Sequence, residues 1–375
     1  MKRSEVVLIL AVLVLLGMGA VILYGTTKIG TVSAQYAEQS VQRHLLIVLF
    51  GLLVMGPVSM CDYHRLIRWK WVWMGIAWVL LVGVLFTAGR NGARRWYFIG
   101  PLTVQPTEIA KVAVILFLAG YLSAKEELIR KWKGLLVPCA VLGSCCVLVL
   151  VQPDFGSAAI LGSVGLVMLF LSGVSLWYGV PLLLVATPPV VYHALSSEYR
   201  RKRIWDYVMV LQGQIPEGQI REALIALGSG GWTGIGLGES RQKLFYLPEV
   251  RTDFIYAVVG EELGFIGALA VVFLFCLVLW AGFKIADEAE DKAGALIAIG
   301  ITTNICLQAF INMGVVSALV PNKGLPLPFI SKGGSSVLVL LVSIGILLNV
   351  AAHRKPRPGV DWVGDARLVD LPKEG

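Results

Sequence analysis

The feature that most constrains this chain is a series of long apolar runs separated by charged or glycine-rich segments. We count ten runs, and each reaches the length of about 17–25 residues that a helix needs to cross a bilayer. Backbone polar groups in lipid must be paired within the spanning segment, so the runs predict an all-α polytopic membrane protein of about ten transmembrane helices. Their approximate limits are 5–25, 44–60, 71–88, 105–123, 134–152, 156–172, 174–194, 254–283, 293–319 and 334–352.

The composition agrees with a membrane protein and excludes two other classes. Hydrophobic residues make up 57% of the chain and charged residues 15%, whereas an average soluble domain is about 45–50% apolar and about 25% charged. A soluble domain with this balance would expose large apolar patches, and a disordered chain would be far more polar. The first run is too long for a cleavable signal peptide and lacks a small-residue cleavage site.

The lysines and arginines of the short loops predict the orientation, because cytoplasmic loops carry an excess of these residues. Such residues precede the first run and follow the second, fourth and tenth runs. If there are ten spans, all of these charged segments lie on the same side of the membrane. We therefore expect both termini in the cytoplasm. Residues 1–353 then form one membrane domain with a large extracytoplasmic loop at 195–253, between spans seven and eight, and residues 354–375 form a cytoplasmic tail.

The remaining basic residues are unusual for this topology. Fifteen of the 32 lysines and arginines fall on the outer side, and eight of them lie in the long loop. Long loops can translocate despite their charge, so one interpretation is a solvated basic surface. The other is a binding site for an anionic ligand, such as a lipid phosphate.

Two groups of polar residues flank short turns near this outer surface. The first contains Arg94, followed by Glu108 and Lys111 at the start of an apolar run. Glu108 suits a helix N-terminus, and Lys111 shares its helix face, so the two form either a site or a structural ion pair. The second group contains Asp154, which is either a site residue or the N-cap of the next helix.

Two further groups surround the start of the last three runs. One includes a glycine-rich segment, Lys243 and Asp253, with Glu261 and Glu262 in the run that follows. Asp253 is either a site residue or a helix N-terminal carboxylate. The other group is the Pro/Gly-rich stretch 321–334, which is either an ordinary loop or a segment that lines a cavity. Together the four groups place cations, glycine backbone, hydroxyls and a carboxylate on one face, as expected for binding a lipid-linked diphosphate.

These motifs resemble the SEDS family (shape, elongation, division and sporulation), the peptidoglycan glycosyltransferases of the FtsW, RodA and SpoVE type. The resemblance covers about residues 85–350, and residues 236–249 are most similar to the cell-division branch, FtsW. Thr107, Arg251 and Lys332 depart from the usual Ser, His and Tyr of the family motifs. The matching motifs are Gly92–Trp96, Gln105–Lys111, Gln152–Gly156, Leu247–Phe254, Gly260–Gly264 and Leu327–Ser336.

The resemblance implies an inverting enzyme of the bacterial cytoplasmic membrane that polymerises lipid II into glycan strands during cell division and releases undecaprenyl diphosphate. It implies Asp253 as the catalytic residue, a divalent cation (magnesium or manganese) as cofactor, and no nucleic acid. It also implies a class B penicillin-binding protein and other divisome proteins as partners. No metal ligands are readable from the sequence. The candidate substrate-binding residues are Arg94, Glu108, Lys111, Asp154, Lys243, Lys323, Ser331, Gly333, Gly334, Ser335 and Ser336.

Three alternatives remain open from the sequence: an elongation-type RodA polymerase, a lipid II flippase or transporter, and a non-catalytic scaffold for a transpeptidase. Transporters often contain inverted repeats and bind substrate at the midplane of broken helices. No repeat is apparent in this sequence, and the polar motifs gather at one face. This arrangement favours chemistry at the membrane surface.

Overall fold

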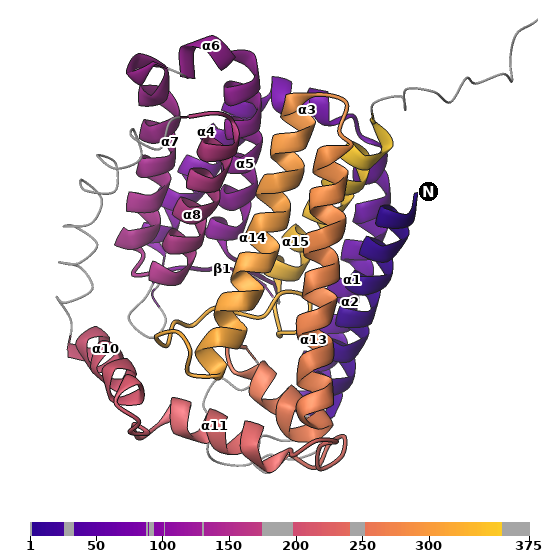
Figure 1. Ribbon diagram of the computed structural model, residues 1–375, viewed down its shortest axis with the longest axis vertical. Helices are drawn as coiled ribbons and strands as arrows, with labels where there is room; N and C mark the ends of the chain where they lie inside the picture. Colours follow the sequence, from indigo (N-terminus) through magenta and orange to yellow (C-terminus); the bar gives the residue numbers. More distant parts are fainter. Residues whose placement is uncertain are drawn as a thin grey trace, which may run out of the picture.

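The computed structural model describes residues 2–25, 34–87, 89, 94–100, 102–129, 131–174, 198–240 and 252–354. Within these ranges the protein is a bundle of long helices with a small two-stranded sheet and a layer of shorter helices across one end (Figure 1). The predicted all-α polytopic fold is therefore confirmed. The predicted span 174–194 lies outside the described residues, apart from its first residue.

Nine long helices occupy the positions of the other predicted spans. Seven of them are apolar over a length that can cross a membrane, while α4 and α8 are shorter apolar helices. The 3-10 turn Val84–Phe86 extends α4 toward the predicted limit of its span. The nine are α1 (Arg3–Gly25), α2 (Ala34–Met60), α4 (Lys70–Gly83), α5 (Pro106–Ala124), α7 (Trp132–Val151), α8 (Phe155–Leu171), α13 (Ile255–Asp287), α14 (Lys292–Val316) and α15 (Ser335–Ala352).

The short elements lie at the two opposite ends of the bundle (Figure 1). Helices α3 (Tyr63–Arg68) and α6 (Glu126–Ile129) lie at the end that also holds the N-terminus. Helices α10 (Glu198–Leu211) and α11 (Gln219–Ser229) lie across the other end. The strands β1 (Tyr97–Ile99) and β2 (Leu102–Val104) form an antiparallel hairpin that leads into α5.

Helix α5 forms the centre of the bundle, with α14 beside it. In its most apolar stretch 78% of α5 is buried, and it packs against α4, α8 and α14. The peripheral helices instead expose large apolar side chains, such as Leu53 on α2 and Val79 on α4. Lipid can cover these surfaces at no cost, whereas water could not, so the pattern fits a bundle embedded in a bilayer.

Helix α13 is interrupted near its beginning by Gly264, whose φ of 68° is not helical. The amides of Phe265 and Ile266 donate to carbonyls of the glycine-rich segment, and Phe265 N lies 2.9 Å from Gly231 O. Glu261 and Glu262 therefore precede the break and are buried beside that segment. The predicted span 254–283 is therefore interrupted at Gly264, where tertiary hydrogen bonds replace the helical pattern.

Candidate active site

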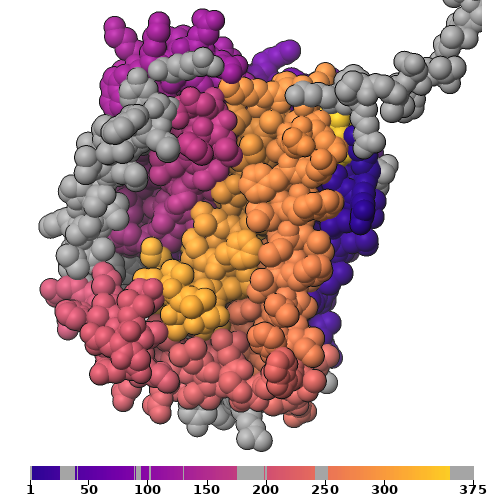
Figure 2. Space-filling model, in the orientation of Figure 1, coloured from indigo at the N-terminus to yellow at the C-terminus, as the bar shows by residue number. Residues whose placement is uncertain are grey.

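The loop between α14 and α15, residues 317–334, contacts the segment that carries Asp253, the start of α8 and strand β2. It lies at the same end of the bundle as α10 and α11, and its yellow-orange surface emerges beside theirs in Figure 2. The loop contains three prolines and three glycines over residues 321–334, so it cannot continue either helix. Most of its apolar side chains, including Leu325, Leu327 and Phe329, are buried, and this burial anchors the loop in the protein.

Asp253 lies at the start of α13 and is held against this loop. The side-chain amide of Asn312 on α14 donates both to the Asp253 carbonyl, at 2.8 Å, and to the Leu325 carbonyl, at 2.6 Å. A Cβ atom on Gly324 would lie 2.5 Å from Oδ2 of Asp253. The carboxylate therefore lies directly against Gly324, and an added Cβ at this position would displace it.

Ser331 fixes the same region from the other end of the loop. Its hydroxyl accepts a hydrogen bond from the Leu327 amide at 2.7 Å and donates to the carbonyl of Thr252. Ser331 is buried, and its hydroxyl is engaged by two backbone groups. We interpret Ser331 as a residue that positions Asp253.

Lys323 adds a cation next to the glycine that contacts Asp253. It lies in the loop, outside the spanning helices, and is partly buried. Burial lowers the pKa of the Lys323 ammonium below its ordinary value, because the charged form loses hydration. A partly dehydrated cation interacts with an anion more strongly than a fully exposed one does.

A buried ion pair on α5 connects to the loop through α14. Lys111 Nζ lies 2.8 Å from Glu108 Oε1 and donates to Gln308 Oε1, also at 2.8 Å. The amide nitrogen of Gln308 in turn donates to the Pro326 carbonyl at 3.0 Å. The predicted contact between Glu108 and Lys111 is present, and Gln308 links it to the loop that holds Asp253.

The N-termini of α5, α8 and α15 meet at the same end. Asp154 caps α8 by accepting from the Ser157 amide at 3.2 Å, and it also accepts from the Gln105 side chain at 3.2 Å. The Gln105 backbone amide donates to the Ser335 hydroxyl at 2.9 Å. Asp154 thus has the capping role that the sequence left open, while Gln105 links it to the N-terminus of α15.

The residues at the N-terminus of α15 also contact β2 and α2. Gly334 packs against β2, where an added Cβ would lie 2.8 Å from Thr103 Oγ1. The carbonyl of Gly333 lies 3.3 Å from His44 Nδ1 on α2. Ser336 follows within the first turn of α15. The unpaired amides of a helix N-terminus and two hydroxyls therefore lie at the end of the bundle where the loop carries Lys323.

Comparison with known proteins now identifies the family of this chain. Residues 6–356 match the family described as cell cycle protein, which comprises FtsW, RodA and SpoVE. The chain belongs to the FtsW/RodA/SpoVE family. The stage V sporulation protein E of Bacillus subtilis (strain 168) is 38% identical over 360 residues, which cover 94% of this chain and 98% of the relative. The "probable peptidoglycan glycosyltransferase FtsW" of Geobacter sp. (strain M18) is 37% identical over 369 residues, covering 95% and 99%.

Solved structures of the FtsW/RodA/SpoVE family share the fold. One chain of a peptidoglycan synthase complex superimposes with a TM-score of 0.74 at 27% identity, covering 92% of this chain and 96% of that one. The rod shape determining protein RodA of Thermus thermophilus superimposes with a TM-score of 0.69 at 27% identity, covering 93% and 97%. The family resemblance predicted from the motifs is confirmed.

One predicted residue of this FtsW/RodA/SpoVE protein, Arg94, does not join the cluster around the loop. Arg94 is exposed and donates to the Leu85 carbonyl at 2.7 Å, beyond the end of α4. Its neighbour Arg95 instead holds the turn before α8, by donating to the carbonyls of Gln152, at 3.1 Å, and Pro153. Lys243 lies outside the described residues.

Sequence reasoning missed Gln308, Asn312 and His44, which connect the helices to the loop of this family member. All three are buried polar side chains within apolar helices. Polar residues inside a membrane span are costly and usually have a partner or a function, so their position in the runs was an available signal. Gln308 and Asn312 are four residues apart and therefore share one face of α14.

Proposed function

We propose that this protein is a peptidoglycan glycosyltransferase that polymerises lipid II into glycan strands during cell division and releases undecaprenyl diphosphate. The observation that carries the proposal is the contact of the Asp253 carboxylate with Gly324, next to the partly buried Lys323. It places a candidate proton acceptor against the loop that carries a candidate diphosphate-binding cation. The names of the FtsW relatives support the activity and the division role.

In the proposed reaction a sugar hydroxyl of one substrate attacks the anomeric carbon of another, with inversion. Asp253 takes the proton from that hydroxyl as general base. The bond to the diphosphate breaks, and the departing diphosphate requires positive charge more than it requires an acid. Lys323 supplies that charge, and the amides of the α15 N-terminus, from Gly333 to Ser336, supply hydrogen-bond donors.

The paired residues Glu108 and Lys111 lie on α5 and connect to the loop through Gln308. Lys111 is held by Glu108 and Gln308, so it contributes a fixed positive end toward the loop. Asp154 orders the α8 N-terminus next to Gln105. Arg94 is exposed at the same end of the bundle, and we assign it to the surface over which the lipid-linked substrate approaches.

A divalent cation, magnesium or manganese, is part of the proposal. The described residues contain no group of three or more His, Cys, Asp or Glu side chains that could hold a metal by themselves. Magnesium in phosphate-handling sites usually keeps several waters and binds one or two carboxylates together with substrate phosphates. Asp253 and the diphosphate of the substrate fit that donor set, and the cation would neutralise charge on the leaving group.

The proposed topology places the Asp253 loop on the extracytoplasmic face. Helix α3, which carries Arg65 and Arg68, and α6, which follows Lys125, lie at the opposite end (Figure 1). Lys2 and Arg354 both pair with Glu288. These cations fit the cytoplasmic side under the positive-inside rule. Both termini are then cytoplasmic, with residues 1–353 forming the membrane domain, residues 195–253 the outer loop and residues 354–375 the tail. The partner we propose is a class B penicillin-binding protein within the divisome, as the match to a chain of a peptidoglycan synthase complex suggests.

The test is polymerisation of lipid II by the purified full-length protein in complex with its partner. Asp253→Asn is expected to abolish glycan polymer, while Glu217→Gln, an exposed carboxylate between α10 and α11, retains wild-type activity. Polymer formed by Asp253→Asn at the wild-type rate would remove the general-base assignment. A wild-type complex that moves lipid II across vesicles without forming polymer would instead establish a flippase, and complementation of a depletion strain by Asp253→Asn would establish a scaffold.

A further inference from the structure

Helix α10 is attached to the active-site loop by one face. Arg203 donates to the Asn322 carbonyl at 3.3 Å, and the Tyr207 hydroxyl donates to the Leu319 carbonyl at 3.0 Å. Asn322 also donates to Gln219 at the start of α11, at 3.2 Å. Positions 203 and 207 are one turn apart, so these contacts fix one side of α10 against the loop.

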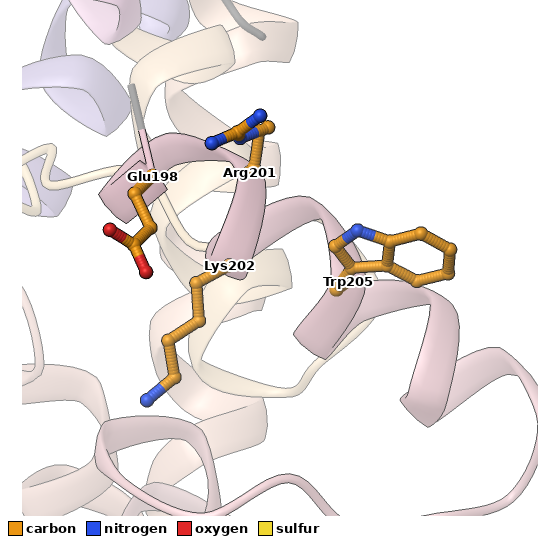
Figure 3. A pocket seen from close by; sticks show the side chains of 4 residues that line it. All are labelled: Glu198, Arg201, Lys202 and Trp205. Carbon is orange, nitrogen blue, oxygen red and sulfur yellow. The ribbon is translucent and has the colours of Figure 1, made fainter. Parts of the chain in front are cut away.

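The opposite face of α10 lines an open hollow of about 630 Å³, separate from the loop that holds Asp253 (Figure 3). The described residues that line it are Glu198, Arg201, Lys202 and Trp205. At 100° per residue these four positions fall within about a third of the helix circumference, opposite Arg203 and Tyr207. Glu198 and Lys202 extend to the same side of the helix in Figure 3. The described part of the lining thus belongs to one face of α10.

The cations of this face lack protein partners within the described part of the chain. Arg201 and Lys202 are exposed, and neither forms an ion pair with a described carboxylate. Among the described lining residues, two cations and one carboxylate give a net charge of +1. That charge matches a phosphodiester monoanion better than it matches a diphosphate.

The same face also carries exposed apolar side chains. Trp205 is 65% exposed and Met209 is 36% exposed. Helices that lie in a membrane interface combine lysine and arginine with tryptophan and long aliphatic residues, because the first bind headgroups and the second enter the acyl boundary. Helix α10 has this combination and crosses one end of a transmembrane bundle (Figure 1).

We propose that the α10 hollow binds the phosphate headgroup of an anionic membrane phospholipid, with Arg201 and Lys202 as phosphate ligands and Trp205 and Met209 against its glycerol and upper acyl region. Arginine forms paired hydrogen bonds to phosphate oxygens, and lysine adds a point charge. Glu198 limits the site to a singly charged headgroup. This site is independent of the proposed lipid II chemistry and does not use Asp253 or Lys323.

The test is native mass spectrometry of the purified full-length protein titrated with phosphatidylglycerol or phosphatidylcholine. Wild-type protein is expected to retain phosphatidylglycerol preferentially, and the combined Arg201→Gln and Lys202→Gln variant to bind it about tenfold more weakly, since two charged phosphate contacts are lost. Arg221→Gln is the matched control, because Arg221 is exposed on the neighbouring α11 and does not line the hollow. It should bind like wild type.

A second variant guards against misfolding as an explanation. Glu198→Gln removes the carboxylate from the lining and is expected to bind phosphatidylglycerol several-fold more tightly, a gain that a damaged protein would not show. Equal binding of the two phospholipids by wild type would overturn the proposal, as would unchanged affinity in both the double variant and Glu198→Gln. A parallel titration with undecaprenyl diphosphate separates the two lipid phosphates. If the double variant weakens only that ligand, the hollow belongs to the diphosphate-linked lipid and the proposal is wrong.

Discussion

Gly324 lies directly against the carboxylate of Asp253, because a Cβ atom at position 324 would come within 2.5 Å of Oδ2. Gly324 is exposed, and its φ is not in the left-handed region, so the backbone itself tolerates a larger residue. The glycine is therefore needed for the space that it gives to the neighbouring carboxylate. This relationship leads to a substitution that acts on Asp253 without changing it.

We predict that Gly324→Ala lowers the rate of lipid II polymerisation by about 10–100-fold, since a displacement of about 1 Å in a catalytic group costs about that much. The unfolding temperature should change little. The control is Gly228→Ala on α11, where an added Cβ meets nothing within 4 Å. A Gly324→Ala enzyme with wild-type turnover would show that the position of the Asp253 carboxylate does not limit the reaction.

The sequence predicted the long helices well because each apolar run must satisfy its own backbone in lipid. It did not predict the break at Gly264. This glycine lies in the same apolar run as Gly267, which stays helical, so the local sequence does not distinguish the two. The difference lies in hydrogen bonds from the following residues to carbonyls of the glycine-rich segment, such as Phe265 to Gly231. Contacts between distant parts of the chain cannot be read from the local pattern.

In the site, too, contacts within one helix could be predicted from the sequence, whereas contacts between distant residues could not. The pairing of Glu108 with Lys111 follows from their spacing on one helix face, and it is present at 2.8 Å. The contacts of Asn312 with Asp253 and of His44 with Gly333 join residues that are 59 and 289 positions apart. Their existence depends on how the helices pack, so a single sequence names the polar residues without naming their partners.

The buried pair of Glu108 and Lys111 yields a prediction about stability. Lys111→Met leaves the Glu108 charge buried and uncompensated, and breaking such a pair costs about 3–5 kcal/mol of folding free energy. The combination of Glu108→Gln with Lys111→Met should recover much of that loss, because no unpaired charge remains. Unfolding of the purified protein in detergent measures both values. If the double variant is as unstable as Lys111→Met, the loss comes from packing and not from the unpaired Glu108 charge.

Lys111→Ala also separates a structural role from a role in diphosphate binding. If Lys111 supports the diphosphate, the KM for lipid II should rise and turnover should fall by about tenfold or more, as expected when a charge that stabilises the transition state is removed. Measuring initial rates over a range of lipid II concentrations separates the two parameters. Unchanged kinetics in the folded fraction would restrict Lys111 to its ion pair with Glu108.

Ser331 gives a prediction that distinguishes positioning from substrate binding. Ser331→Ala removes the hydrogen bonds to Leu327 and Thr252, and leaving such buried groups unpaired costs about 1–3 kcal/mol. We expect kcat to fall, because Asp253 follows Thr252, while the KM for lipid II stays close to the wild-type value. Steady-state kinetics test this split. A Ser331→Ala enzyme with raised KM and unchanged kcat would instead place the hydroxyl on the substrate.

Lys323 leads to a prediction about pH, because burial lowers the pKa of its ammonium group. The charged form that binds diphosphate is present below the lowered pKa and is lost as the pH rises through it. Polymerisation should therefore decline at a lower alkaline pH than an ordinary lysine would produce. The effect on stability has the opposite sign. Between the folded and unfolded pKa values of Lys323 the unfolded chain binds more protons, so the free energy of unfolding rises with pH there.

Two variants at this position test the prediction for activity. Lys323→Arg remains charged throughout this pH range and should keep its activity at alkaline pH, whereas Lys323→Gln should be slow at every pH. Rates measured from pH 6 to pH 10 at constant ionic strength test both variants, and an alkaline limb identical in wild type and Lys323→Arg would assign that limb to another group.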